Sequence, residues 1–332
     1  MIGSEDAGAP LRGTQDDPGF TLTQLRYFSI AAETGSMTAT ARAMHASQSA
    51  VSNAIAQLER HVKVQLFIRH HARGLTLTPA GREFVLQARD LLARANDILS
   101  LAGGLGESVE GEVKLACYHT LSPFYLPRIL ERVGEQYPLL SIRVVEGEKA
   151  EVFESLLTGE AEVALTYESE VPGMIATEQL AVSPPYVIVG ERHRLARRTP
   201  RRRITLQELA EDRMILLDIP FPGRYFLDIA ENSGISPRIA FSSPNFETVR
   251  SMVAAGLGYS VLNQRPVHDL TYDGGRVVAL ELEGTFADIP VVMATVRGSR
   301  LTTRAEAVAA LLREAVPSIA AEFSPHRPSR RA

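Results

Sequence analysis

The chain has one cysteine, Cys117, among its 332 residues. A single thiol cannot form an intramolecular disulfide framework or a thiolate metal cage, and such sparse cysteine fits a reducing cytoplasm. No uninterrupted apolar stretch approaches the roughly 18 residues of a membrane-spanning helix. Residues 1–19 lack the basic segment and apolar run of a secretion signal. We therefore expect a cytoplasmic protein that has no membrane partner.

The chain also lacks an overall basic charge, because its formal net charge is −4. Affinity for a nucleic acid would have to come from a local cluster of Lys and Arg. Between Phe20 and Thr78 there are six basic residues and only two acidic ones. Positive charge is therefore concentrated near the amino terminus. The basic residues are Arg26, Arg42, Arg60, Lys63, Arg69 and Arg73, against Glu33 and Glu59.

The same segment has the pattern of three short helices with a tight second turn. Gly35 ends the first helix, Ser36 caps the second, and Ser47 caps the third after a turn at His45-Ala46. One apolar face of the third helix is predicted to be buried. It consists of Val51, Ile55 and Leu58. This arrangement is typical of a helix-turn-helix, although any three-helix bundle can show such spacing.

Short amides and hydroxyls occupy the other face of the third helix near its start, where they suit base edges in a major groove. Residues 65–78 follow as a predicted hairpin wing whose basic tip can lie along phosphates. The candidate DNA-binding residues are Ser36, Thr38, Ser47, Gln48, Ser49, Ser52, Asn53, Arg69, Arg73 and Thr76.

A further helix begins at Pro79 and carries a narrow apolar stripe with alternating spacings of four and three. Such a stripe is typical of a coiled-coil seam, so we interpret it as a dimerisation surface. The alternative is one amphipathic helix packed on its own domain. The stripe consists of Phe84, Ala88, Leu91, Ala95, Ile98 and Ala102.

The stretch from Leu22 to Gly81 resembles the winged helix-turn-helix of LysR-type transcriptional regulators. The resemblance rests on Leu25-Arg26-Tyr27-Phe28, Gly35-Ser36-Met37, Ser47-Gln48-Ser49-Ala50-Val51-Ser52 and Leu77-Thr78-Pro79-Ala80-Gly81. Ser49 departs from the family, which often has proline there. The resemblance implies a homodimer or homotetramer on double-stranded promoter DNA with an interrupted dyad. RNA polymerase is a further candidate partner.

From Gly111 onwards, short β-branched runs alternate with helical segments, which predicts βαβ units and a mostly parallel sheet. This part resembles the family's effector-binding region, an α/β fold built like a periplasmic binding protein from two subdomains. The expected organisation is a disordered tail (1–19), a winged helix-turn-helix (20–78), a linker and dimerisation helix (79–104), an effector-binding domain (111–320) and a second disordered tail (321–332). Subdomain I would comprise about 111–183 and 286–320, and subdomain II about 184–285.

Ligands in open α/β sheets bind beyond the carboxyl ends of the strands, where loops and helix N-termini meet. Ser122 and Pro123 suit the cap and the first position of a helix that follows the first strand. Free N–H groups at that helix start and the Thr120 hydroxyl could hold a carboxylate, so we expect a small anionic effector. The candidate effector-binding residues are His119, Thr120, Ser122, Thr166, Tyr167, Arg224, Tyr225, Asn245 and Phe246. Plain helix caps or exposed side chains are the alternative interpretation of these residues.

Two other functions compete with the regulator: an enzyme, because two-subdomain α/β clefts also host catalysis, and a pure ligand-binding module. The sequence offers no nucleophile elbow, P-loop, dinucleotide fingerprint or metal-ligand spacing, so we expect no enzymatic activity, cofactor or metal. The arginine-rich segment from Arg192 to Arg203 is interpreted as a solvated loop, with a second DNA or partner contact as the alternative. The effector, the target genes and the direction of regulation remain open at this stage.

Overall fold

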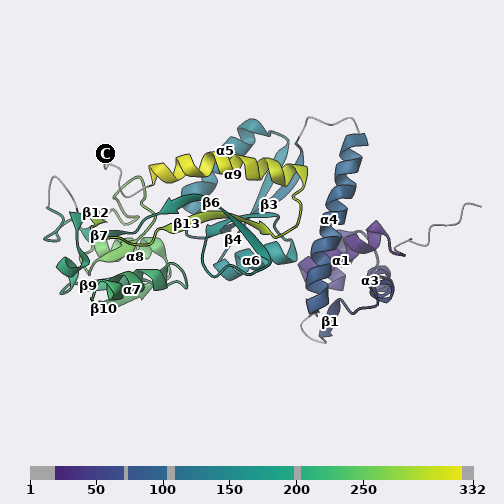
Figure 1. Ribbon diagram of the computed structural model, residues 1–332, viewed down its shortest axis with the longest axis horizontal. Coiled ribbons are helices and arrows are strands. Elements are labelled where there is room, and N and C mark those ends of the chain that lie inside the picture. Colours follow the sequence, from purple (N-terminus) through teal and green to yellow (C-terminus); the bar gives the residue numbers. More distant parts are fainter. Residues whose placement is uncertain (1–18, 71–73, 103–108, 198–202, 324–332) are drawn as a thin grey trace, which may run out of the picture. The chain divides into compact units, whose positions relative to one another are not determined.

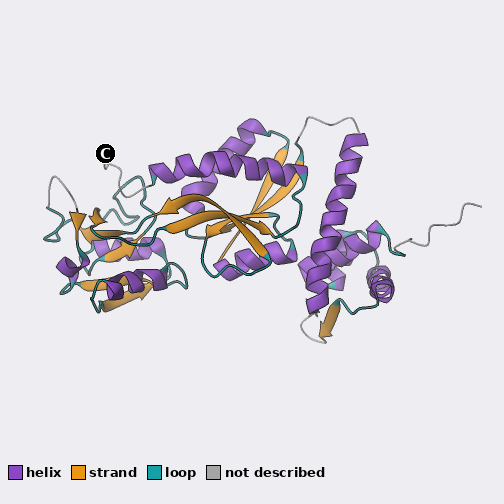
Figure 2. Cartoon of the chain, in the orientation of Figure 1, coloured by secondary structure: helices purple, strands orange, loops and turns teal. Residues whose placement is uncertain are grey.

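The computed structural model describes residues 19–70, 74–102, 109–197 and 203–323. The chain divides into two compact units, Met1–Leu92 and Ala93–Ala332. Figure 2 shows that the described part of the first unit is mainly helical, whereas strands and helices mix in the second. Each unit has its own hydrophobic core.

The first unit contains α1 (Leu22–Thr34), α2 (Met37–Ala43), α3 (Gln48–Val62), β1 (Phe67–His70), β2 (Gly74–Leu77) and the first part of α4 (Pro79–Ala102). The expected caps are present: Ser36 accepts from the Ala39 amide and Ser47 from the Ala50 amide. Gly35 ends α1 in the left-handed region, at a φ of 60°. The unit is a winged helix-turn-helix.

β1 and β2 form an antiparallel pair in which Phe67 faces Leu77 and His70 faces Gly74. The hairpin also contacts α1, since the Leu75 amide donates to the Gly35 carbonyl over 2.8 Å. Gly74 has a φ of 77°, and a Cβ there would collide with that carbonyl oxygen. Glycine therefore lets the wing approach the end of α1 closely.

Subdomain I of the second unit is a five-stranded sheet in the order β4-β3-β5-β13-β6. The strands are β3 (Gly111–Tyr118), β4 (Leu140–Gly147), β5 (Val163–Tyr167), β6 (Ile175–Ser183) and β13 (Ile289–Val296). β3, β4 and β5 are parallel, whereas β13 is antiparallel to both of its neighbours. The helices are α5 (Ser122–Gln136), α6 (Lys149–Thr158) and α9 (Thr303–Glu322), with α5 and α9 packed together (Figure 1).

Subdomain II contains a four-stranded sheet in the order β11-β7-β12-β8 and a parallel pair, β10-β9. The strands are β7 (Tyr186–Gly190), β8 (Arg203–Ile204), β9 (Arg213–Leu217), β10 (Arg238–Ser243), β11 (Ser260–Leu262) and β12 (Val277–Leu282). The amide of Ile215 donates to the Tyr259 carbonyl, which joins the pair to the larger sheet. Its helices are η1 (Leu206–Leu209), α7 (Gly223–Asn232) and α8 (Phe246–Ala254).

The chain crosses from subdomain I to subdomain II between Ser183 and Tyr186, and returns between Leu282 and Ile289. At the carboxyl end, α9 continues through Glu322, and Phe323 is only 8% exposed. Residues 321–323, which the sequence assigned to a disordered tail, therefore belong to the folded unit.

Candidate DNA-binding and effector sites

The exposed start of α3 carries most of the candidate base-reading side chains. Gln48, Ser49 and Asn53 are exposed, and Ser52 is half-buried one turn further on. The Thr38 hydroxyl donates to Gln48 Oε1 over 3.3 Å, which links the exposed face of α2 to α3. The structure thus brings amide and hydroxyl groups from two helices onto one surface.

The wing reaches this same surface through Arg69. Its Nη1 donates to Ser52 Oγ on α3 over 3.4 Å, while Thr76 pairs with His70 Nε2 at 2.9 Å across the hairpin. Arg73, predicted to contact phosphates, lies outside the described residues. Ser36 and Ser47 act as helix caps, so their side-chain oxygens are already engaged.

The sequence analysis assigned no role to Glu59, which anchors the wing to α3. Its Oε1 accepts from the backbone amides of Leu66 and Phe67 over 2.8 and 3.1 Å. The sequence indicates this role of Glu59 only in that Glu59 is one of two acidic residues in a basic segment. Glu59 fixes the start of the hairpin relative to α3.

The predicted dimerisation stripe on α4 divides into two parts. Phe84 packs edge-on against Phe28 with ring centroids 5.4 Å apart, and Ala88 is 2% exposed in the core of the first unit. Leu91 and Ile98 are 42% and 65% exposed. The start of the stripe therefore packs on its own domain, as the alternative interpretation held, because the winged domain needs those side chains to close its core. Ala95 is half-buried, and the side chain of Ala102 lies outside the described part.

The two subdomains of the second unit meet at the carboxyl ends of β3 and β5. Tyr118 and Tyr167 end these strands, with ring centroids 5.7 Å apart. Thr120 follows β3 and is 7% exposed, and Thr166 is fully buried. Neither threonine hydroxyl has a hydrogen-bond partner among the described residues. Buried hydroxyls of this kind usually have a partner, so they mark where a ligand or water would be favoured.

A buried polar network behind Tyr167 was missed by the sequence analysis. The Tyr167 hydroxyl accepts from Asn263 Nδ2 over 2.8 Å and from Gln264 Nε2 over 3.3 Å. Gln264 also donates to Ser183 Oγ over 2.9 Å, at the crossing between the subdomains. Burial raises the pKa of Tyr167 to about 12, so its hydroxyl stays protonated at neutral pH. No spacing in the sequence places residues 263–264 beside Tyr167.

His119 faces an acidic neighbour: its Nε2 lies 3.1 Å from Glu148 Oε1, an ion pair only when the imidazole is protonated. Ser122 lies inside α5 rather than at its cap, because Leu121 takes the cap position. The Ser122 hydroxyl donates to the Tyr118 carbonyl over 3.4 Å, and the side chain is buried. The predicted capping role of Ser122 is therefore wrong.

A pocket of about 530 Å³ lies between the start of α5 and the start of α8. His119, Thr120, Asn245 and Phe246 are among its lining residues. Aromatic rings form one side: Phe124 packs edge-on against both Phe246 and Phe323, at 5.7 and 5.2 Å. Phe323 was not expected here, since the sequence placed it in a tail.

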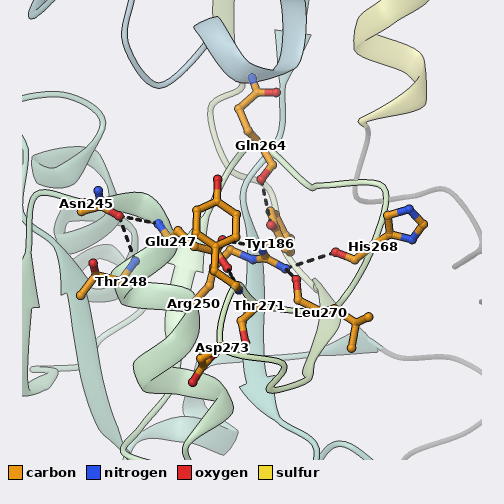
Figure 3. Close-up of polar contacts among 11 residues, drawn as sticks. Tyr186, Asn245, Glu247, Thr248, Arg250, Gln264, His268, Leu270, Thr271 and Asp273 are labelled. Atoms are coloured by element: carbon orange, nitrogen blue, oxygen red, sulfur yellow. Dashed lines mark hydrogen bonds and ion pairs between the residues drawn. The ribbon is translucent and has the colours of Figure 1, made fainter.

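Figure 3 shows the polar contacts at the start of α8. Asn245 Oδ1 accepts from the amides of Glu247 and Thr248, both over 3.0 Å, so it caps the helix. The buried Arg250 guanidinium donates to Glu247 and to the carbonyls of His268 and Leu270. The charge of Arg250 is therefore compensated within subdomain II.

Arg224 and Tyr225, both proposed from the sequence as effector contacts, are engaged elsewhere. Arg224 Nε lies 2.8 Å from Asp228 on the same helix, and its side chain is 66% exposed. The Tyr225 hydroxyl donates to the Ala287 carbonyl, in the segment that returns to subdomain I. Neither residue lines the pocket of the described structure. Asp228 lies four residues after Arg224 on the same helix, so the two side chains are neighbours and form an ion pair.

Cys117 is buried in β3, and burial raises the pKa of its thiol to about 12. A thiol in this state is neither exposed nor ionised at neutral pH.

In the arginine-rich segment from Arg192 to Arg203, Arg194 pairs with Asp212 at 2.6 Å and Arg203 with Glu281 at 2.8 Å. Residues 198–202 lie outside the described part.

None of the helices in the described ranges combines the length and the apolar character that crossing a membrane requires. The described residues also hold no group of three or more His, Cys, Asp or Glu side chains arranged to bind a metal ion.

Two family models match the chain. Residues 22–82 match the bacterial regulatory helix-turn-helix protein of the lysR family, and residues 106–317 match the LysR substrate binding domain. Together they span both units of the structure.

The chain is also similar to individual regulators of known sequence or structure. The chain is 30% identical to the HTH-type transcriptional regulator CysB of Haemophilus influenzae over 73% of this chain and 75% of that protein. It is 31% identical to a probable hydrogen peroxide-inducible genes activator of Streptomyces viridosporus, over 89% and 94%. Among solved structures, HinK, a LysR family transcriptional regulator from Pseudomonas aeruginosa, is 33% identical, with a TM-score of 0.60 over 90% of this chain and 99% of that one.

Proposed function

Because the chain belongs to the LysR family of transcriptional regulators, we propose that it binds promoter DNA through α3 and the wing, under control of a small effector in the cleft. The observation that carries this proposal is the single exposed surface formed by Gln48, Ser52 and Arg69. Amides and hydroxyls there suit base edges, and Arg69 suits a phosphate. The family consists of regulators, and no residue constellation among the described residues of the second unit favours a catalytic alternative.

A dimer follows from the geometry that DNA requires. Two recognition helices related by a twofold axis contact half-sites about one helical turn apart, which predicts an operator with an interrupted dyad. Leu91 and Ile98, seven positions apart on α4, expose apolar side chains suited to a second copy. We propose that they form the part of the dimer seam that the winged domain leaves uncovered.

We further propose that the effector carries an acidic group. The start of α5 has no side-chain cap, and the buried Thr120 hydroxyl just before it has no hydrogen-bond partner among the described residues. Arg250 and Arg128 contribute little net charge, because Glu247 and Glu322 pair with them. The balance of charge favours a single carboxylate over a polyanion.

DNA binding is tested by fluorescence anisotropy with the protein's own upstream DNA and a shuffled duplex of equal length, at several salt concentrations. We expect a salt-sensitive complex that is at least about 10³-fold tighter on upstream DNA. If the protein bound the two duplexes with equal affinity, both without and with the metabolites of a cell extract, the proposed function as a regulator would be contradicted.

The role of Thr120 is tested by Thr120→Val, which keeps the shape and removes the hydroxyl. We expect a carboxylate found by thermal-shift screening to bind the variant more weakly, since a polar group of the ligand loses its partner. Unchanged titration with that carboxylate would count against Thr120 as a contact.

A further inference from the structure

Where the two subdomains meet, a side chain of one packs into the other. Phe221 belongs to subdomain II, in the loop between β9 and α7, yet its ring packs against subdomain I. The ring centroid lies 5.8 Å from that of Tyr167, with the planes at 66°. Lys149 Nζ, at the start of α6, lies over the same ring at 5.4 Å from its centroid. A cation and a phenol ring thus enclose one benzyl group.

The backbone of Phe221 is held at the same place, because its carbonyl accepts a hydrogen bond from the Tyr118 hydroxyl. Burial raises the pKa of Tyr118, so the phenol keeps its proton and remains a donor. Tyr118 also packs edge-on against Tyr167 and His119. We name Tyr118, Tyr167 and Lys149 the aromatic cage.

Lys149 brings a positive charge to a partly enclosed position. Its side chain is 14% exposed, and its ammonium donates to Glu170 Oε2 over 2.9 Å and to Ser169 Oγ over 3.4 Å. Glu170 is itself 87% exposed, so solvent screens its charge more than that of Lys149. A carboxylate in the cage would therefore meet an ammonium whose present counter-ion is screened by solvent.

The chemistry of the cage matches a flat ring that bears an oxygen acceptor. An aromatic ring packs favourably against the ring of Tyr167 and against the ammonium of Lys149. The Tyr118 hydroxyl already donates to one oxygen, and the buried Thr120 hydroxyl has no hydrogen-bond partner among the described residues. Phe221 supplies both the ring and the oxygen in the described structure.

We propose that Phe221 is a built-in plug of the effector cleft, and that the effector is a small aromatic acid whose ring and carboxylate replace the ring and carbonyl oxygen of Phe221. This inference rests on the proposed function for its regulatory meaning. The contacts of Phe221 link the two subdomains, so displacing the plug removes contacts that favour their present arrangement. A ligand that binds only the unplugged state shifts the population towards it.

The first experiment compares Phe221→Ala with the wild-type chain in titrations of benzoate, the probe for an aromatic acid. The variant loses the ring but keeps the carbonyl of residue 221, so the place of the ring beside Tyr167 and Lys149 is vacated and we expect benzoate to bind the variant at least tenfold more tightly. Phe241→Ala is the matched control, because Phe241 lies on β10 and is 43% exposed. An affinity of Phe221→Ala equal to that of the control would overturn the proposal.

The second experiment asks whether Lys149 recognises the carboxylate. In the Phe221→Ala background, benzoate should bind more tightly than benzyl alcohol, which has the ring without the charge. Adding Lys149→Met should abolish that preference by weakening benzoate more than benzyl alcohol, because benzyl alcohol loses only the contact between its ring and the ammonium. A preference that survives Lys149→Met would contradict the cage as the binding site.

The third experiment keeps a ring at position 221 in case the alanine variant fails to fold. The chain contains no tryptophan, so Phe221→Trp introduces a single indole into the plug. We expect benzoate to change its emission in a saturable way, with no saturable change in Phe241→Trp. Absence of that change would overturn the plug. All three measurements omit DNA, so failure of operator binding and failure of the plug are distinguishable.

Discussion

Tyr167 is the residue at which the effector cleft and the crossing between the subdomains meet. Its ring faces Phe221 and Tyr118, while its hydroxyl accepts from Asn263 and Gln264. Gln264 continues this network to Ser183, the last residue of β6. One side chain thus contacts the proposed plug at its ring and is linked at its oxygen, through Gln264, to the crossing segment.

Replacing Tyr167 by Phe should destabilise the second unit by about 1–3 kcal/mol. The ring is retained, but the amides of Asn263 and Gln264 lose a buried acceptor. Urea unfolding measures the difference. Tyr272→Phe is the control, because Tyr272 is 93% exposed and should change stability by less than about 0.5 kcal/mol. Equal stability of the two variants would refute the structural role of the hydroxyl.

At the scale of elements, α3 and the wing are expected to divide the work of DNA binding. Gln48→Ala should relax sequence choice, because an amide that can pair with adenine is lost from the start of α3. Arg69→Ala should weaken operator and random DNA alike and reduce the salt slope by about one. Anisotropy titrations on both DNAs at several salt concentrations separate the two effects. If Gln48→Ala lowered both affinities equally, its assignment to base reading would be wrong.

The helix α4 has two faces with different tasks along its length. Ile98→Asp should dissociate a dimer without unfolding the winged domain, since Ile98 is 65% exposed and stands outside that domain's core. Sedimentation velocity at micromolar concentration measures the state, and Gln87→Asp, an exposed position on the same helix, is the control. A variant that sediments as the wild-type chain does would exclude Ile98 from the seam.

At the scale of the whole molecule, six tyrosines and Cys117 have raised pKa values, chiefly through burial. The folded chain keeps these protons at pH values where the unfolded chain releases them. Their contribution to stability is complete below the unfolded pKa values, 9.0 for Cys117 and 10.0 for tyrosine, and is lost as the pH rises through the folded values.

The unfolding midpoint in urea should therefore fall steadily between about pH 9 and pH 12. Tyr167 and Tyr259, with pKa values of about 12, should both contribute. Following tyrosine ionisation by ultraviolet absorbance in the same samples provides the control, because phenolate should appear together with unfolding. A midpoint that stayed constant to pH 12 would contradict the burial of these side chains.

Patterns within a few turns of chain were predictable from the sequence. The caps Ser36 and Ser47, the buried Val51, Ile55 and Leu58, and the alternation of strands and helices after Gly111 follow from local spacing. The prediction of a LysR-type regulator, with its winged and two-subdomain fold, is confirmed by the family matches and the structure. Where each candidate side chain points was harder to predict. Asn245 forms a helix cap, and Arg224 pairs with Asp228, although each looked available to a ligand.

The sequence by itself determined the family through the motifs that resemble LysR-type regulators. It also determined the helix caps and the alternation of strands with helices, because periodicity and capping act between residues that are close along the chain. The predicted mostly parallel sheet is wrong, since β13 is antiparallel to β5 and β6, and β7 is antiparallel to β11 and β12. Only the tertiary structure decided which groups face the cleft. Phe221 lies 103 residues after Tyr118, and Asn263 lies 96 residues after Tyr167, yet each pair shares a hydrogen bond. Contacts of this kind form where two subdomains pack together, and no local spacing encodes them. The proposed plug and the polar network arise from that packing, whereas the stripe on α4 is divided by the packing of Phe84 and Ala88 in the core of the first unit.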